Sequence, residues 1–240
     1  MSQKLIIILR AWQGGIMKAT CFVAAAILLA GLTACADPGE RLSQYYIKHP
    51  EALQEALNRL AQYQEQEDTK AVMAAISASS SWLYSDEYGN RLGSMNAPIK
   101  VAMFTDYNCA VCKKAIKSLI NDPKFKNGEV SIFIHDLPIL GEDSAYFARI
   151  GMMAQSNEEF AEYFEGLMAI DRPSRAYAEK LAMNVGIDPK AAITEPALSK
   201  SDVIIRRNRD FFRRVGASGT PVFITRGELF KGWNPLKKPF

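Results

Sequence analysis

The fold is decided by residues 99–120, which read IKVAMFTDYNCAVCKKAIKSLI. The first seven of them form a short apolar run of the kind that indicates a buried strand. From Cys112 onward the apolar residues fall on one side of a helix, at Ala115, Ile116, Leu119 and Ile120. The turn between the two elements carries Cys109 and Cys112. The sequence therefore predicts a C-x-x-C pair at the start of the first helix after a strand.

This position suits thiol chemistry. A thiol attacks only as the thiolate, and an ordinary cysteine is mostly protonated at neutral pH. The free backbone N–H groups and the dipole at a helix N-terminus stabilise an anion. We therefore predict that Cys109 caps the helix and is the attacking thiol, while Cys112 faces inward and resolves the mixed disulfide. The charges of Lys113 and Lys114 are expected to add a favourable field, although exposed lysines contribute little through water.

The cysteine count supports a redox role. Two of the four cysteines, Cys21 and Cys35, lie in the N-terminal leader, so only Cys109 and Cys112 remain in the folded body. A loop this small hardly restricts the unfolded chain, which argues against a structural disulfide, although an inert buried disulfide is the alternative. The two cysteines alone are too few for a structural zinc site, and no histidine pair accompanies them, because the chain has only His49 and His135. We expect no metal and no cofactor.

The first 36 residues are typical of an export signal. Met17-Lys18 precedes an apolar run over 19–32, which is short for a membrane span, and small residues follow. Residues 32–35 (LTAC) resemble the lipobox of bacterial lipoproteins, which predicts lipidation at Cys35 and a lipid anchor. Residues 34–36 (ACA) are also an A-x-A cleavage site, which would release a soluble protein; an uncleaved membrane anchor is a third alternative. The first two place the protein in the bacterial periplasm or envelope, an oxidising compartment.

Composition and charge exclude some functions. The chain has 240 residues, 48% of them hydrophobic and 23% charged, as in a soluble globular protein. Three of its 29 basic residues (Lys4, Arg10 and Lys18) lie in the leader, so the remainder has 26 basic and 26 acidic residues. A nearly neutral body does not favour nucleic acid as a partner.

The apolar pattern divides the chain into three parts. We expect a leader over 1–36, an N-terminal helical extension over 37–80 and a compact domain over 81–240. In the extension, the spacing predicts a helix over 41–77 that has Pro50 in a first turn and breaks at 77–81. Its apolar stripe consists of Leu53, Leu57 and Leu60.

The remainder of the domain alternates strands with helices. We expect a second strand over 130–134, a helical insertion over about 143–200 that is interrupted at Asn157, at 172–173 and at 186–189, and a further helix over 202–215. Strands over 222–225 and 228–231 follow, with a turn at Arg226-Gly227. The predicted order is β-α-β, helices, α-β-β.

Three segments resemble one known family, the DsbA-like thioredoxin-fold proteins, and in particular their ScsC branch. They are residues 104–113 (FTDYNCAVCK), 137–144 (LPILGEDS) and 219–223 (GTPVF). The resemblance implies an α/β thioredoxin fold with a helical insertion and an N-terminal helical extension, and the activity of a protein thiol–disulfide oxidoreductase. It also implies that Pro221 is cis and faces Cys109.

Thr220 and Pro221 are candidates for substrate binding. A proline lacks the N–H group, and the carbonyl of the residue before it stays free to pair with an extended substrate strand. An ordinary turn proline is the alternative. Two departures from the family concern neighbouring features: Ala110-Val111 replaces the usual residues between the cysteines, and only seven residues follow Trp233 where a closing helix is usual. We expect the sheet edge there to be exposed or paired with another segment.

These observations favour an exported oxidoreductase. Its expected partners are unfolded or misfolded envelope proteins and a membrane redox partner, and the direction, oxidase or isomerase, is open with a lean towards isomerase. In the resembling branch the N-terminal region oligomerises, which predicts a homo-oligomer through helix 41–77. Two alternatives remain: a copper-binding, copper-stress module that uses Cys109, Cys112 and Met103, or a non-catalytic assembly lipoprotein.

Overall fold

A computed structural model describes residues 37–86 and 90–240. The predicted leader, with Cys21 and the lipidation candidate Cys35, lies outside these residues. The chain divides into two compact units, one ending at Glu65 and the other running from Gln66 to Phe240. Among the described residues, none of the helices combines the length and the apolar character needed to cross a membrane.

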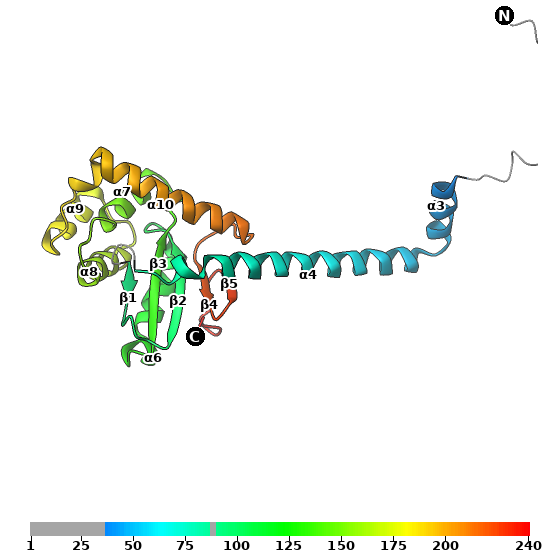
Figure 1. The fold of residues 1–240 in the computed structure, drawn as a ribbon, viewed down its shortest axis with the longest axis horizontal. Coiled ribbons are helices and arrows are strands. Elements are labelled where there is room, and N and C mark those ends of the chain that lie inside the picture. Colours follow the sequence, from blue (N-terminus) through cyan, green and yellow to red (C-terminus); the bar gives the residue numbers. More distant parts are fainter. Residues whose placement is uncertain (1–36, 87–89) are drawn as a thin grey trace, which may run out of the picture. The chain divides into compact units, whose positions relative to one another are not determined.

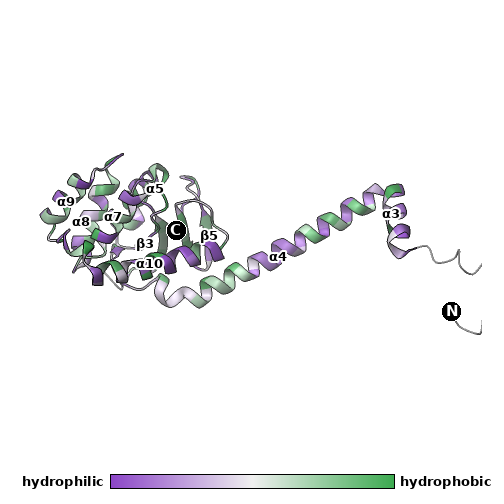
Figure 2. Cartoon of the chain, turned by 90° about the horizontal axis from the view of Figure 1, so that it is seen from above, coloured by the Kyte–Doolittle hydropathy of each residue, from purple (hydrophilic) through white to green (hydrophobic). Residues whose placement is uncertain are grey.

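The first unit is built from helices. Helix α3 (Pro38–Lys48) is capped by Asp37, whose carboxylate accepts the N–H of Gly39, and α4 (Pro50–Leu83) follows directly. The single helix expected over 41–77 is thus two helices. Pro50 begins the second one, in the first-turn role expected of it. Hydrophobic and hydrophilic residues are both present along α4 (Figure 2).

The predicted break at 77–81 is wrong, because α4 continues to Leu83. The final part of α4 belongs to the second unit, in whose core Ala75, Ile76 and Leu83 are buried. Serine competes with the helix in isolation, but here Ser80 donates its hydroxyl to the carbonyl of Ser77 within the helix. Packing of the apolar side therefore overrides the low helix propensity of the serines.

The second unit contains a five-stranded sheet in the order β1-β3-β2-β4-β5 (Figure 1). Its strands are β1 (Arg91–Leu92), β2 (Ile99–Thr105), β3 (Val130–Asp136), β4 (Val222–Thr225) and β5 (Glu228–Lys231). Strand β2 pairs in parallel with β3, with Ile99 opposite Val130, and antiparallel with β4. Strand β5 forms one edge of the sheet, and its side chains are exposed or half-buried.

Helices cover both faces of this sheet. They are α5 (Ala110–Ile120), α6 (Pro123–Lys126), α7 (Glu142–Gly151), α8 (Asn157–Met168), α9 (Arg175–Asn184), the short 3-10 helix η2 (Ala191–Ile193) and α10 (Glu195–Arg214). Side chains alternate along a strand, so Val101 and Met103 of β2 join the core formed with α5, α7 and α8. Ala102 and Phe104 join a second core with α10 and the end of α4.

The predicted order β-α-β, helices, α-β-β is confirmed. Strands 99–105, 222–225 and 228–231 lie where the sequence placed them, and the strand from Val130 extends to Asp136. The helix expected over 202–215 begins earlier, at Glu195. The sequence did not predict β1 or α6, which have only two and four residues.

Candidate active site

The two cysteines of the folded body lie at the junction of β2 and α5. Cys109 is the N-cap of α5, and its Sγ accepts a hydrogen bond from the backbone N–H of Cys112 at 3.2 Å. The N–H of Cys109 donates to the carbonyl of Asp106 at 3.1 Å, which fixes the preceding loop. Both cysteines are free thiols. The structure thus places Cys109 at the helix cap, where its thiolate meets the free end of the backbone.

The two thiols have opposite pKa shifts. The pKa of Cys109 falls from 9.0 to about 6, chiefly because the Cys112 thiol donates a hydrogen bond to its sulfur. A hydrogen bond with the Thr220 side chain and the backbone N–H groups of Cys112 and Val111 lower it further. Burial acts against the fall. The pKa of Cys112 is raised, first by burial and then by its hydrogen bond to Cys109. One sulfur is therefore a thiolate at neutral pH, and the other keeps its proton.

The two cysteines also differ in their access to solvent. Cys109 is 7% exposed and Cys112 is 0% exposed, so only the low-pKa sulfur reaches the surface. Val111, between them, is exposed. A disulfide of another protein could be attacked only by Cys109, since the sulfur of Cys112 is reached from within the site.

The loop before β4 completes the site. The peptide bond between Thr220 and Pro221 is cis, as the family resemblance implies. The Cys109 thiol donates to the carbonyl oxygen of Thr220 at 3.4 Å, so this carbonyl lies beside the attacking sulfur. Thr220, which is 111 residues from Cys109 in the sequence, is thus brought beside the cysteine pair.

A buried carboxylate that sequence reasoning missed holds the loops around this site. Asp106 accepts hydrogen bonds from the N–H groups of Asn108, Ile139 and Leu140 at 2.7, 2.8 and 2.9 Å, and from the hydroxyl of Ser144 at 2.7 Å. The Asn108 amide also donates to Ser144. Asp106 therefore ties the loop before Cys109 to the segment that follows β3. Both segments are among those that resemble the family. That shared resemblance was the signal in the sequence that could have indicated a link between them.

Lys113 differs from expectation. The sequence suggested an exposed lysine, but the residue is only 7% exposed, whereas Lys114 is exposed as expected. The side chain of Lys113 turns towards α8, where its ammonium donates to the carbonyls of Leu167 and Ile170. The hydrophobic spacing of α5 alone does not show this, because α8 lies far away in the sequence.

Two buried titratable groups lie at the end of β3. Burial lowers the pKa of His135 to about 4, and its Nε2 atom lies 2.9 Å from the carbonyl of Leu83. Burial, followed by the charge of Asp106, raises the pKa of Asp136 to about 8. The imidazole of His135 therefore pairs with a carbonyl of α4 and not with a cysteine sulfur. The helix cap and the neighbouring thiol, not an imidazole base, therefore account for the thiolate.

Within 37–86 and 90–240, no three His, Cys, Asp or Glu side chains come together as metal ligands would. Met103, the thioether considered for copper, is 0% exposed and packs in the core with Cys112.

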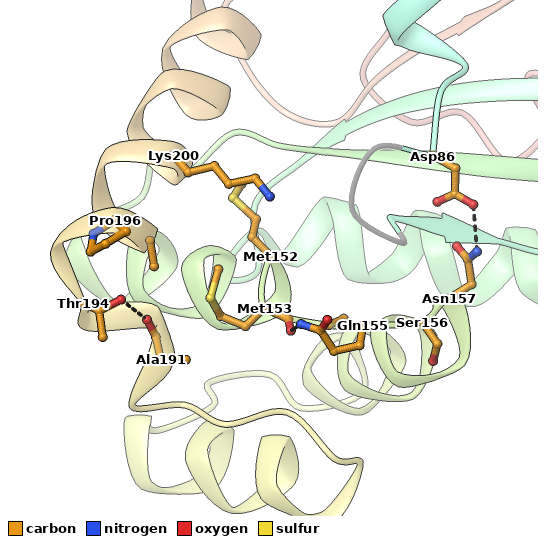
Figure 3. A pocket seen from close by; sticks show the side chains of 12 residues that line it. Asp86, Met152, Met153, Gln155, Ser156, Asn157, Ala191, Thr194, Pro196 and Lys200 are labelled. Carbon is orange, nitrogen blue, oxygen red and sulfur yellow. Dashed lines mark hydrogen bonds between the residues drawn. The ribbon is translucent and has the colours of Figure 1, made fainter.

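A cavity of about 630 Å³ lies away from the cysteines, where α7, α8 and α10 meet (Figure 3). It is lined in part by Met152, Met153 and Lys200. Asn157 donates to Asp86 at 2.7 Å at its margin. The attacking sulfur does not line it, so the thiol chemistry is not located there.

Comparisons with known proteins agree with this geometry. Residues 85–238 match the protein family described as thioredoxin. A linker-deletion mutant of ScsC from Proteus mirabilis has a TM-score of 0.63 and 21% identity, over 83% of this chain and 90% of that one. The thiol-disulfide exchange protein alpha-DsbA2 from Wolbachia pipientis has a TM-score of 0.59 and 22% identity, over 68% and 89%.

A periplasmic thioredoxin-like protein from Salmonella enterica serovar Typhimurium has a TM-score of 0.50 and 28% identity, over 59% of this chain and 80% of that one. No curated protein matches the chain. These neighbours confirm the predicted thioredoxin fold and its resemblance to ScsC and DsbA-like proteins. They are consistent with the enzyme class that the sequence predicts, a protein thiol–disulfide oxidoreductase.

Proposed function

The chain belongs to the thioredoxin family, and from that premise we propose that it is an exported thiol–disulfide oxidoreductase that works through Cys109 and Cys112. One observation carries the proposal: the pKa of Cys109, which is 7% exposed, is about 6, while the pKa of the fully enclosed Cys112 is raised. A nucleophile that is ionised at neutral pH and a protonated resolving thiol are the two groups that disulfide exchange requires.

The reaction follows from this asymmetry. The Cys109 thiolate attacks one sulfur of a substrate disulfide, a mixed disulfide forms, and the other substrate sulfur leaves as a thiolate. Cys112 then loses its proton and attacks Cys109, which releases the second substrate sulfur. The enzyme dithiol is oxidised by two electrons and the substrate disulfide is reduced; the reverse sequence oxidises a substrate dithiol.

The proposed substrates are unfolded or misfolded envelope proteins, which present extended segments. The carbonyl of Thr220 lies beside the Cys109 sulfur, and Pro221 follows it directly. An extended substrate segment could therefore pair with this loop while its cysteine meets Cys109. A membrane redox partner would restore the enzyme between turnovers.

Trapping tests the assignment of the two thiols. Replacing Cys112 with serine removes the resolving thiol, so mixed disulfides with envelope proteins should accumulate through Cys109 and appear on non-reducing gels. Replacing Cys109 with serine instead should abolish them, and the mature wild-type protein should reduce insulin. Equal trapping by the Cys109→Ser variant would show that the roles are wrong.

For the direction of the reaction we favour isomerisation or reduction over dedicated oxidation. Oxidants of this fold stabilise the reduced thiolate strongly, and neither Ala110 nor Val111 brings a side-chain donor to the sulfur of Cys109. We therefore expect the Cys109–Cys112 disulfide to have an intermediate reduction potential. The reduced protein should refold scrambled ribonuclease; rapid peptide oxidation by the disulfide form, without activity on scrambled ribonuclease, would identify an oxidase.

Export and lipidation belong to the same proposal. The LTAC segment at residues 32–35 supports a lipid anchor at Cys35, and a periplasmic thioredoxin-like protein is among the similar structures. A palmitate analogue should label the wild type and leave Cys35→Ser unlabelled. An unlabelled wild-type protein that begins at Asp37 would instead identify the soluble form.

A second role, self-association, is favoured by one observation in the first unit. Leu53, Leu57 and Leu60 lie on one side of α4 and are 41%, 51% and 52% exposed. Leucines at positions i, i+4 and i+7 form an apolar stripe along a helix, and helices pack together through stripes of this kind. We include a homo-oligomer formed through this stripe in the proposal.

A further inference from the structure

The second half of α10 concentrates positive charge. Residues 203–214 contain five arginines and one acid, Asp210, whereas the chain beyond the leader has equal numbers of basic and acidic residues. None of these basic residues is a lysine. A guanidinium holds its N–H donors in a plane and binds phosphate groups through paired hydrogen bonds, which an ammonium does not. This stretch is therefore suited to an anionic partner.

Two of these arginines keep their charge available to a ligand. Asp210 pairs with Arg213, with 2.6 Å between the carboxylate oxygen and the guanidinium nitrogen. Within the described part of the chain, Arg206 and Arg214 form no ion pair, and both are exposed. The single acid of the stretch is thus compensated by Arg213, and the charges of Arg206 and Arg214 are not balanced by it.

Both arginines line a cavity of about 340 Å³ between the end of α4 and α10, within the second unit. Trp82 and Phe211 also line it, with 5.3 Å between their ring centroids. The guanidinium of Arg207 lies over the indole of Trp82, 4.4 Å from the ring centroid. Stacked aromatic and guanidinium groups of this kind give the cavity a fixed wall.

An apolar side chain adjoins the charges. Val203 lines the same cavity and is 61% exposed, three residues before Arg206 and so on the same side of α10. An acidic peptide or a free ion would use the arginines alone. A phospholipid surface offers phosphate groups to the arginines and, just below them, an apolar layer for Val203 and the indole of Trp82. The combination of charge and apolar surface favours a lipid surface.

We propose that this face of α10, made of Val203, Arg206, Arg207 and Arg214 with Trp82 beside it, binds the surface of an anionic membrane. The cavity receives the phosphate of a lipid head group. This inference goes beyond the proposed function, because it uses none of the groups of the thiol chemistry. It also needs no acyl chain, since the binding comes from charge and from apolar contact at the surface.

Vesicle binding tests the proposal on the non-lipidated protein that begins at Asp37. Vesicles of phosphatidylcholine alone are compared with vesicles of equal parts phosphatidylcholine and phosphatidylglycerol, and cosedimentation gives the partition coefficient. The double variant Arg206→Gln, Arg214→Gln removes two charges from the face. The double variant Lys124→Gln, Lys126→Gln is the matched control, because it removes two exposed charges from α6 of the same unit.

The wild type should bind the mixed vesicles and not those of phosphatidylcholine, and added salt should weaken the binding through screening. A basic residue near an anionic surface contributes about fivefold, so the arginine variant should bind about 25-fold more weakly. The lysine control should change binding by less than about twofold, since charges away from the surface are screened. Val203→Ser should weaken binding severalfold through the loss of apolar burial.

Three results would overturn the proposal. Failure of the wild type to bind the mixed vesicles is the first. Equal losses in the arginine and lysine variants are the second, because net charge and not this face would then decide binding. The third is release from the vesicles by inorganic phosphate or polyglutamate at constant ionic strength, which would assign the cavity to a free phosphate or to an acidic protein segment. Circular dichroism verifies that the variants are folded.

Discussion

The sulfurs of Cys109 and Cys112 share one hydrogen-bonded turn but differ in charge at neutral pH. The difference arises from position: Cys109 meets N–H groups and a donating thiol at the helix cap, while Cys112 is enclosed. The histidine of the second unit does not contribute, because the Nε2 atom of His135 lies 2.9 Å from the carbonyl of Leu83. The backbone and the partner thiol therefore do the work that an imidazole does in cysteine proteases.

The low pKa of Cys109 predicts how the reactivity of this thiol depends on pH. Alkylation of Cys109 should have its midpoint near its pKa of about 6, well below the ordinary 9.0. The pKa of Cys109 is lower in the folded protein than in the unfolded chain. Ionisation of Cys109 therefore stabilises the reduced, folded protein, and this stabilisation is complete at pH values above the ordinary pKa. This stabilisation is lost as the pH falls through about 6.

Urea unfolding of reduced wild type and Cys109→Ser at several pH values measures this effect. The wild type should gain stability relative to the variant between pH 6 and pH 9, the interval between the two pKa values. A constant difference across that interval would mean that Cys109 titrates as in the unfolded chain.

Asp106 should matter more for stability than an exposed acid does. Replacing it with asparagine removes the charge from a carboxylate that accepts four hydrogen bonds and is 1% exposed. We expect a loss of about 2 kcal/mol or more in the free energy of unfolding, measured with urea. Asp202→Asn is the control, since its exposed ion pair with Arg149 is worth about 0.5 kcal/mol. Equal losses in both variants would contradict the role of Asp106.

At the scale of elements, the contrast between the two parts of α4 can be measured. Ile76 is 4% exposed in the core of the second unit, while Leu57 is 51% exposed in the first. Ile76→Ala should lower the free energy of unfolding of that unit by about 2–4 kcal/mol through the cavity it leaves. Leu57→Ala should change it by about 0.5 kcal/mol or less. Similar effects of the two substitutions would show that α4 does not pack as described.

Elements with a strong local pattern were predictable from the sequence, and short or serine-rich ones were not. The apolar run 99–105 is a strand over the same residues because it is buried on both faces. Strand β1 has two residues, too few for any alternation to appear. The serines near Ser79 predicted a break that tertiary packing prevents. The cap position of Cys109 was likewise local, whereas the burial of Lys113 depends on α8.

At the scale of the whole molecule, the boundary between the two units lies within a continuous helix. Glu65 ends the first unit and Gln66 begins the second, yet α4 runs through both. A shortened protein that begins at Ser81 would lack Ala75, Ile76 and Ser79, which are buried in the second unit. A change in the mass or stability of this shortened protein could therefore come either from loss of the first unit or from damage to the core of the second. Point substitutions in the leucine stripe avoid this problem.

The stripe itself provides the final prediction. Replacing Leu53, Leu57 and Leu60 together with alanine removes the exposed apolar side chains and keeps a good helix former at each position. If these leucines are buried between copies of the chain, each contributes about 1.5–3 kcal/mol to association. The triple variant should then be a smaller species than the wild type by light scattering at equal concentration. The unfolding of the second unit should be unchanged, because the three side chains do not belong to its core.

A matched control uses the same stretch of α4. Gln54, Asn58 and Gln62 are exposed polar residues of the same stretch, spaced four residues apart along the helix. Their joint replacement by alanine changes three side chains without removing apolar surface, so the mass should remain that of the wild type. Equal masses for the wild type and the leucine variant would show that the stripe does not join copies of the chain. The exchange chemistry would then belong to the second unit alone, because Cys109, Cys112 and Thr220 all lie within it.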